Sequence, residues 1–132
     1  MMIVQVVGQT EIRLSRFDLD DLKIVLENKM MRLSALAMFV ASLGRCTFAV
    51  LDHYALRMDV EIENIVTKMT WEFSNDPTKF KVINMDIYWP ELPEKRLKSV
   101  QRASHKCTIH TTISDCVEIN TRVFNHAEDD AG

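Results

Sequence analysis

The sequence is poor in residues that break or cross-link a chain, with three glycines, three prolines and three cysteines in 132 residues. No two cysteines have the C-x-x-C spacing, so a zinc or iron–sulfur centre has little support. Three scattered thiols are also too few for the disulfide framework of a small secreted protein. The first residues, MMIVQVVGQTEIR, lack the basic segment that precedes the apolar run of a secretory signal. We therefore expect a cytoplasmic protein without metal or other cofactor.

The sequence also lacks an excess of positive charge. Its formal net charge is −3, which argues against a surface for general nucleic-acid binding. Hydrophobic residues make up 47% of the chain, enough for a substantial core. The length fits one domain, which we place at residues 1–132.

One long stretch, LSALAMFVASLGRCTFAVLDHYALR from Leu33 to Arg57, is apolar on nearly every side of a helix. Such a helix is either buried in a core or spans a membrane. Arg45 lies at its middle and Asp52 follows two turns later, so no uncharged run of about 18 residues remains. We predict a buried core helix over residues 34–57, capped by the hydroxyl of Ser34.

The middle of this predicted helix contains both a glycine and a cysteine. Gly44 costs about 1 kcal/mol relative to alanine in a helix, which indicates close packing against another element. Cys46 lies next to Ser42, Gly44 and Arg45, and its thiol is either inert packing or a reactive centre. Arg45 precedes Cys46 but is rotated from it by about 100° around the helix.

The remaining segments read mainly as strands. Alternating and β-branched residues predict strands, while proline and basic residues predict a second helix. For residues 18–31 a strand at 22–26 and a helix capped by Asp18 are both compatible with the pattern. The predicted elements are a hairpin over 2–7 and 11–17, a long hairpin over 59–89 with a bulge near Asn64 and a turn at 74–77, a helix over 94–106, a short helix or turn from Cys107, and a strand over 117–123.

This order predicts an α+β fold with antiparallel sheets wrapped around a long buried central helix. The predicted segments are N-terminal strands at 1–33, the helix at 34–57, hairpin, helix and last strand at 59–123, and a flexible tail at 124–132. One small sheet cannot cover an apolar helix on all sides. We therefore expect an intertwined homodimer that pools two sheets and two helices.

Two cysteine motifs point to a family. Residues 41–49 read ASLGRCTFA, and residues 103–114 read ASHKCTIHTTIS, followed by the strand motif V-E-I at residues 117–119. In this order and spacing, over residues 34–123, they resemble the OsmC/Ohr family of thiol-dependent peroxidases and related proteins. The resemblance implies an OsmC-like domain that acts in the oxidative stress response.

The resemblance also implies roles for individual residues. It makes Cys46 the peroxidatic thiol, which attacks an organic hydroperoxide, and Cys107 the resolving thiol, which then forms a disulfide with it. A dithiol reductant would restore the pair. In the family an arginine from the N-terminal strands stabilises the thiolate, which here would be Arg13 or Arg16. Because a thiol buried in a helix has a raised pKa, such a cation is needed.

The sequence departs from the family pattern at two places. The helix positions where the family has a glutamate that holds this arginine correspond to Ala35, Leu36 and Ala37, none of which is acidic. Thr108 stands where the family has a proline after the second cysteine. Two functions therefore remain open: a peroxidase, and a non-catalytic OsmC-like protein that binds a small apolar ligand or senses redox state.

Other polar residues have weaker functional interpretations. His110 and Lys106 could together lower the pKa of Cys107 at a helix N-terminus. His53 reads as an end-of-helix histidine and Cys116 as packing, although either histidine could join the cysteines in a metal site. The basic residues of the helix at 94–106 are most simply its solvated face; they are Lys95, Arg96, Lys98, Arg102 and Lys106.

Overall fold

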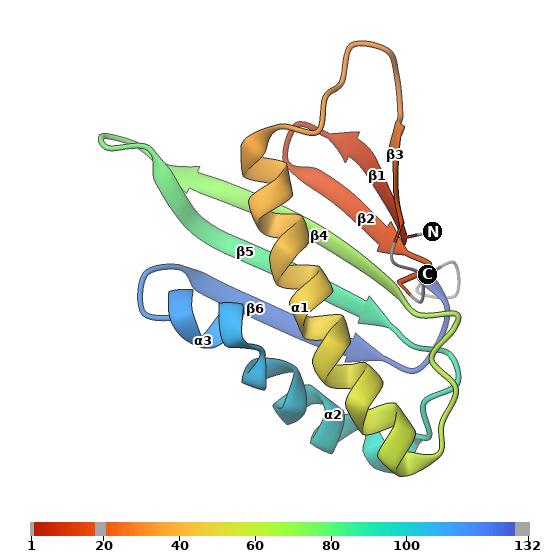
Figure 1. The fold of residues 1–132 in the computed structure, drawn as a ribbon. Helices are drawn as coiled ribbons and strands as arrows, with labels where there is room; N and C mark the ends of the chain where they lie inside the picture. The colour runs from red at the N-terminus through yellow and green to blue at the C-terminus, as the bar shows by residue number, and fades with distance from the viewer. Residues whose placement is uncertain (1, 18–20, 129–132) are drawn as a thin grey trace.

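The computed structural model describes residues 2–17 and 21–128. It has a six-stranded sheet of order β3-β1-β2-β4-β5-β6, and its helices lie on one face of that sheet (Figure 1). The elements are β1 (Met2–Gly8), β2 (Glu11–Ser15), β3 (Leu22–Leu26), α1 (Ala35–Met58), β4 (Val66–Ser74), β5 (Lys79–Tyr88), η1 (Glu94–Arg96), α2 (Leu97–Ala103), η2 (Ser104–Lys106), α3 (Thr108–Ile113) and β6 (Glu118–Phe124). The α+β class is therefore confirmed.

Helix α1 crosses the sheet and begins where the sequence predicted. Ser34 Oγ accepts a hydrogen bond of 3.1 Å from the backbone N–H of Ala37, which satisfies one free donor of the first turn. The helix ends at Asp59, whose left-handed backbone (φ 56°) lets its N–H bond back to the last turn.

The sheet is a single mixed sheet, whereas the sequence predicted antiparallel sheets. β1 pairs with β3 in parallel, and β5 pairs with β6 in parallel. Parallel neighbours need a long crossover connection, and residues 89–117, which contain α2 and α3, supply one between β5 and β6. The strand interpretation of residues 22–26 is confirmed by β3, while Asp18, the cap of the helical alternative, lies outside the described residues.

The long hairpin and the end of the chain differ in detail from the prediction. The first hairpin strand begins at Val66, not near residue 59, and its bulge lies between Glu72 and Phe73, not near Asn64. Residues 124–128, predicted as the start of a flexible tail, are at least half-buried, and Glu128 pairs with Arg13 at 2.6 Å. Residues 129–132 lie outside the described part of the chain.

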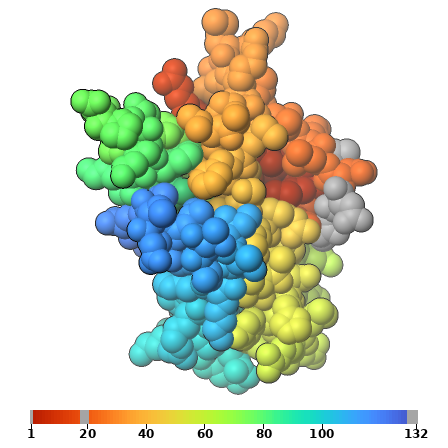
Figure 2. Space-filling model, turned by 60° about the vertical axis from the view of Figure 1, so that its left-hand side comes forward, coloured from red at the N-terminus to blue at the C-terminus, as the bar shows by residue number. Residues whose placement is uncertain are grey.

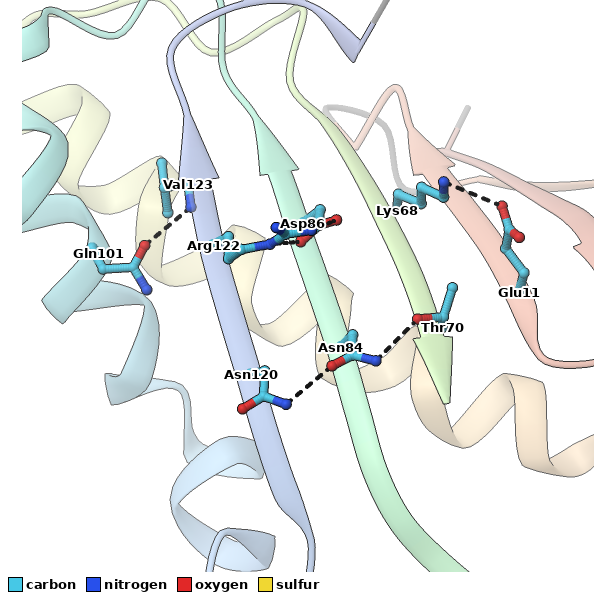
Figure 3. A network of polar contacts seen from close by, with 9 residues as sticks. All are labelled: Glu11, Lys68, Thr70, Asn84, Asp86, Gln101, Asn120, Arg122 and Val123. Atoms are coloured by element: carbon cyan, nitrogen blue, oxygen red, sulfur yellow. Dashed lines mark hydrogen bonds and ion pairs between the residues drawn. The ribbon is translucent and has the colours of Figure 1, made fainter. Parts of the chain in front are cut away.

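The two faces of the sheet differ sharply in polarity. Side chains that alternate along β1, β2, β4 and β5 pack under α1 and form the core. The opposite face carries a polar network (Figure 3). It includes a bidentate ion pair of Arg122 with Asp86, with both bonds at 2.8 Å. It also includes consecutive side-chain hydrogen bonds from Asn120 to Asn84 and from Asn84 to Thr70.

Gly44 lies at the closest approach of α1 to the sheet. A Cβ at this position would overlap Leu14 Cδ1 and lie 2.7 Å from Met69 Sδ. Leu14 and Met69 are both fully buried, on β2 and β4. The predicted close packing at this glycine is therefore confirmed.

Within a single chain α1 is covered by the sheet on one side and by η2 and α3 beside it, and the rest of its surface is exposed. Its side chains form an exposed orange-to-yellow band between α3 and the N-terminal strands (Figure 2). By length and composition alone α1 could cross a membrane, a test that core helices of soluble proteins also pass. The large hydrophobic side chains exposed among the described residues all lie on α1 or on β3 and the loop after it: Leu22, Ile24, Leu26, Met30, Leu36, Met38, Phe39 and Leu56.

Candidate functional site: a pair of thiols between two helices

Cys46 and Cys107 face each other where α1 meets the N-terminus of α3. Cys46 is half-buried in the middle of α1, and Cys107 is the fully buried N-cap residue of α3. The two side chains are close enough for each to shift the pKa of the other. Two thiols that are 61 positions apart in the sequence therefore form one cluster.

The environment of Cys46 favours its thiolate. Burial raises the pKa of Cys46, but hydrogen bonds from the Cys107 thiol and from the backbone N–H groups of Ile109 and Thr108 lower it. The positive charge of Arg45 lowers it further, and the net result is a pKa below the ordinary 9.0. The first turn of α3 thus supplies donors to the sulfur of a different helix.

The environment of Cys107 favours its neutral thiol. Burial raises its pKa, and so does its hydrogen bond to Cys46. The backbone N–H of His110, at 3.3 Å from the sulfur, and the Thr47 side chain oppose this increase without cancelling it. The pair is therefore asymmetric, with one thiol disposed to ionise and the other disposed to donate a hydrogen bond to it.

This asymmetry predicts different pH dependences of alkylation. Because the thiolate is the reactive form, the iodoacetamide reaction of Cys46 should reach half its maximal rate below pH 9.0, and that of Cys107 above pH 9.0. Peptide mass spectrometry after timed labelling in urea-free buffer measures both sites in one sample. Coincident midpoints for the two cysteines would contradict the asymmetry.

The two arginines predicted to serve Cys46 lie elsewhere in the chain. Arg13 alternates with the buried Ile12 and Leu14, so it projects from the outer face of the sheet, where it pairs with Glu128. Arg16 is exposed just after β2, with φ 57°, and is not among the groups that shift the pKa of Cys46. The structure does not bring either side chain to the thiol of the same chain.

Arg45 is the cation among the groups that lower the pKa of Cys46, where its effect is the smallest of those given above, and the sequence analysis did not assign it this role. Its guanidinium lies over the ring of Phe48 at 5.5 Å, and this ring stacks on Phe17 at 4.5 Å. These three side chains line a cleft of about 280 Å³ beside α1. The sequence signal for Arg45 was its position next to Cys46. The rotation of about 100° between neighbouring helix residues does not separate the two groups fully, because the arginine side chain is long.

The remaining candidates have structural roles. Lys106 Nζ donates to Tyr54 Oη at 3.2 Å and is not among the groups that shift the pKa of Cys107. His110 lowers that pKa through its backbone N–H, but the net shift is upward, so the predicted net lowering is wrong. His110 is buried and stacks on His105 at 5.0 Å; burial and then the His105 charge lower its pKa. His53 is exposed on α1.

Cys116 is exposed in the turn before β6, so the prediction that it packs in the interior is wrong. Among residues 2–17 and 21–128, no group of three or more His, Cys, Asp or Glu side chains is arranged to hold a metal ion.

The fold and the site together define an α+β protein with a cysteine pair between its central helix and a second, short helix. The model of the OsmC-like protein family matches residues 26–122, and the chain belongs to this family. This match confirms the resemblance found in the sequence. No curated protein matches the chain.

Solved structures share the fold at low sequence identity. An organic hydroperoxide resistance protein from Legionella pneumophila superposes with a TM-score of 0.60 at 17% identity, over 94% of this chain and 96% of that chain. OhrB of Bacillus subtilis, also an organic hydroperoxide resistance protein, gives 0.54 at 18% identity over 93% and 97%. An OsmC-like protein from Mycoplasma pneumoniae gives 0.58 at 23% identity over 68% and 70%.

Proposed function

We propose that the protein is a thiol-dependent peroxidase that reduces organic hydroperoxides, with Cys46 as the attacking thiol and Cys107 as the resolving thiol. The observation that carries this proposal is the contact between the two thiols, together with the opposite directions of their pKa shifts. Membership in a family whose solved structures include hydroperoxide resistance proteins supports it.

In the first step the Cys46 thiolate attacks the terminal oxygen of R–O–O–H. The sulfur–oxygen bond forms as the oxygen–oxygen bond breaks, leaving a sulfenic acid on Cys46 and an alkoxide that takes a proton to become R–OH. Arg45 and the N–H groups of Thr108 and Ile109 hold the thiolate before attack. They provide the stabilisation that the family draws from another arginine.

In the second step the Cys107 sulfur attacks the sulfenic sulfur, and water leaves as the disulfide forms. A dithiol then reduces the disulfide, returning two thiols and becoming a disulfide itself. The two thiols lie close enough to shift each other's pKa, so the resolving thiol is a neighbour of the sulfur that it attacks.

The test is consumption of tert-butyl or cumene hydroperoxide by the purified protein with dithiothreitol as reductant. Turnover with formation of a Cys46–Cys107 disulfide after one equivalent of peroxide supports the proposal. Absence of turnover, combined with a thermal shift on addition of a small apolar ligand, supports the alternative of a non-catalytic ligand-binding or redox-sensing member. The missing helix glutamate is the feature that favours this alternative.

We also propose that the protein acts as an intertwined homodimer joined through α1. Every large exposed hydrophobic side chain in the described residues belongs to α1, β3 or the loop between them. A groove of about 210 Å³ between α1 and β3 has mainly apolar walls, including Val4, Leu22 and Met38. The opposite face of the sheet is polar, which leaves the α1 face as the one suited to a second copy.

Met38→Glu should convert this dimer to a monomer, because it places a charge in the centre of the apolar groove, where Met38 is 56% exposed in the single chain. Sedimentation velocity measures the change as a halving of the mass. Lys23→Glu is the control, since Lys23 lies on the outer face of β3 between Leu22 and Ile24. A wild-type monomer, or equal behaviour of the two variants, would contradict the proposed interface.

A further inference from the structure

A stripe of basic side chains runs along the helices that lead to Cys107. It consists of Lys95, Lys98, Arg102 and Lys106, and we call it the basic stripe. Its first three members are spaced by three and four residues, which places them on one face of a helix. All four are exposed. From the sequence alone, these residues were interpreted only as the solvated face of a helix.

The basic stripe has no acidic partner in the part of the chain that the structure describes. The ion pairs found there join Arg13 to Glu128, Lys68 to Glu11 and Arg122 to Asp86, and none of them includes a member of the basic stripe. The whole chain carries a net charge of −3. The basic stripe is therefore a positively charged patch on a protein whose net charge is negative.

The basic stripe is continuous with the thiol site. Lys106 immediately precedes Cys107, and its ammonium lies 5.9 Å from the centre of the Tyr54 ring. Arg57 lies over the same ring at 5.7 Å, which adds a second cation from α1. Tyr54 is eight residues after Cys46 on the helix, or about 12 Å along its axis. Positive charge thus extends from the outer surface of α2 to Lys106, the residue before Cys107, and to the Tyr54 ring on α1.

A groove beside the basic stripe has apolar as well as basic lining residues. It has a volume of about 360 Å³, lies between α2 and the edge strand β6, and is lined by the apolar Leu97 and Val123 and by Lys98, Gln101 and Arg102. Gln101 accepts a 3.0 Å hydrogen bond from the Val123 N–H (Figure 3). Its side-chain amide also donates to the Thr121 carbonyl. The edge of β6 is thereby closed to strand addition, so a partner would contact side chains here.

We propose that the basic stripe and this groove dock an acidic protein segment that carries the dithiol reductant. The proposal rests on the proposed function, since it names the partner of the same cysteine pair. Cys107 is fully buried and Cys46 half-buried, so a macromolecular dithiol must be oriented to reach their disulfide. One partner thiolate attacks a sulfur of this disulfide, forms a mixed disulfide and releases the other cysteine as a thiolate. The second partner thiolate then attacks the partner's sulfur in the mixed disulfide and releases the remaining cysteine, so the partner leaves as a disulfide and both cysteines are reduced. Opposite charge accelerates such an encounter.

The experiment uses two synthetic dithiol peptides that differ only in charge. Each has a Cys-Gly-Pro-Cys centre, flanked by glutamates in one peptide and by lysines in the other. Stopped-flow measurement follows reduction of the oxidised full-length protein at low ionic strength. We expect the acidic peptide to react roughly tenfold or more faster than the basic one, with the advantage decreasing as salt shortens the Debye length.

The double variant Lys98→Glu with Arg102→Glu should abolish this advantage and leave the rate with dithiothreitol unchanged. The control is Lys79→Glu with Lys81→Glu, which makes the same charge change at exposed positions of β5 away from α2. The control should keep the preference for the acidic peptide. Equal rates for the two peptides with wild-type protein, or a preference that survives in the stripe variant, would overturn the docking proposal.

Failure of the docking proposal is distinguishable from failure of the peroxidase proposal. Fluorescence anisotropy of the acidic peptide with serines in place of its cysteines measures docking to the reduced protein without any redox step. Binding that is lost in the stripe variant supports the docking surface even if hydroperoxide turnover is absent. No binding, or tighter binding of an RNA oligonucleotide or of anionic vesicles than of the acidic peptide, would refute it.

Discussion

Cys46→Ser should reduce dithiol-dependent consumption of an organic hydroperoxide to the uncatalysed background. A serine hydroxyl is not ionised at neutral pH, so the hydrogen bonds from Thr108 and Ile109 would no longer hold an anionic nucleophile. The loss should be in turnover and not in folding, because the oxygen is smaller than the sulfur and Cys46 is only half-buried. Peroxide loss measured by a xylenol orange assay, with thermal melting alongside, separates the two.

Cys107→Ser should give a different defect from Cys46→Ser. The attacking thiol remains, so one equivalent of peroxide should be consumed, but the sulfenic acid on Cys46 should persist and be trapped by dimedone. Cys116→Ser is the matched control, since Cys116 is the exposed cysteine of the described residues and lies away from the pair. Full activity in Cys46→Ser, or equal losses in all three variants, would remove the cysteine pair from the mechanism.

The sequence was sufficient to predict the parts of the site that depend on local patterns. Ser34 and the apolar run after it define α1 through capping and composition, which act within a few residues. The placement of Cys107 at the start of a short helix follows in the same way. The meeting of Cys46 with Cys107 is a tertiary contact, and it became predictable only through the order and spacing of two motifs that resemble a family.

The features that the sequence did not predict depend on the sheet. The parallel pairing of β5 with β6 requires knowing that residues 89–117 cross over the sheet face, which no local period encodes. The side of the sheet to which Arg13 projects depends on register, and one residue of slip reverses it. The sequence therefore could not show which arginine lies near Cys46, and the groups that lower the pKa of Cys46 within the chain come from α1 and from the start of α3.

The depth at which α1 lies on the sheet sets the position of Cys46, and Gly44 sets that depth. Gly44→Val should lower the free energy of unfolding by about 3 kcal/mol, because its branched side chain would overlap Leu14 and Met69, which have no free volume to enter. Gly44→Ala should cost less, because the overlap of one methyl group is offset by about 1 kcal/mol of helix propensity. Urea unfolding followed by circular dichroism measures both changes.

Gly8→Ala is the matched control for these glycine variants. A Cβ at residue 8 would lie 3.9 Å from Glu11 Cβ, an ordinary van der Waals distance, and Gly8 does not have a positive φ. Its stability should stay within about 0.5 kcal/mol of the wild type. A methyl group at residue 44 would move α1 away from the sheet, and this movement would also separate Cys46 from the N–H groups of α3. The pH dependence of Cys46 alkylation in Gly44→Ala should therefore shift to higher pH. A Gly44→Val protein as stable as Gly8→Ala would show that the helix does not rest on Leu14 and Met69.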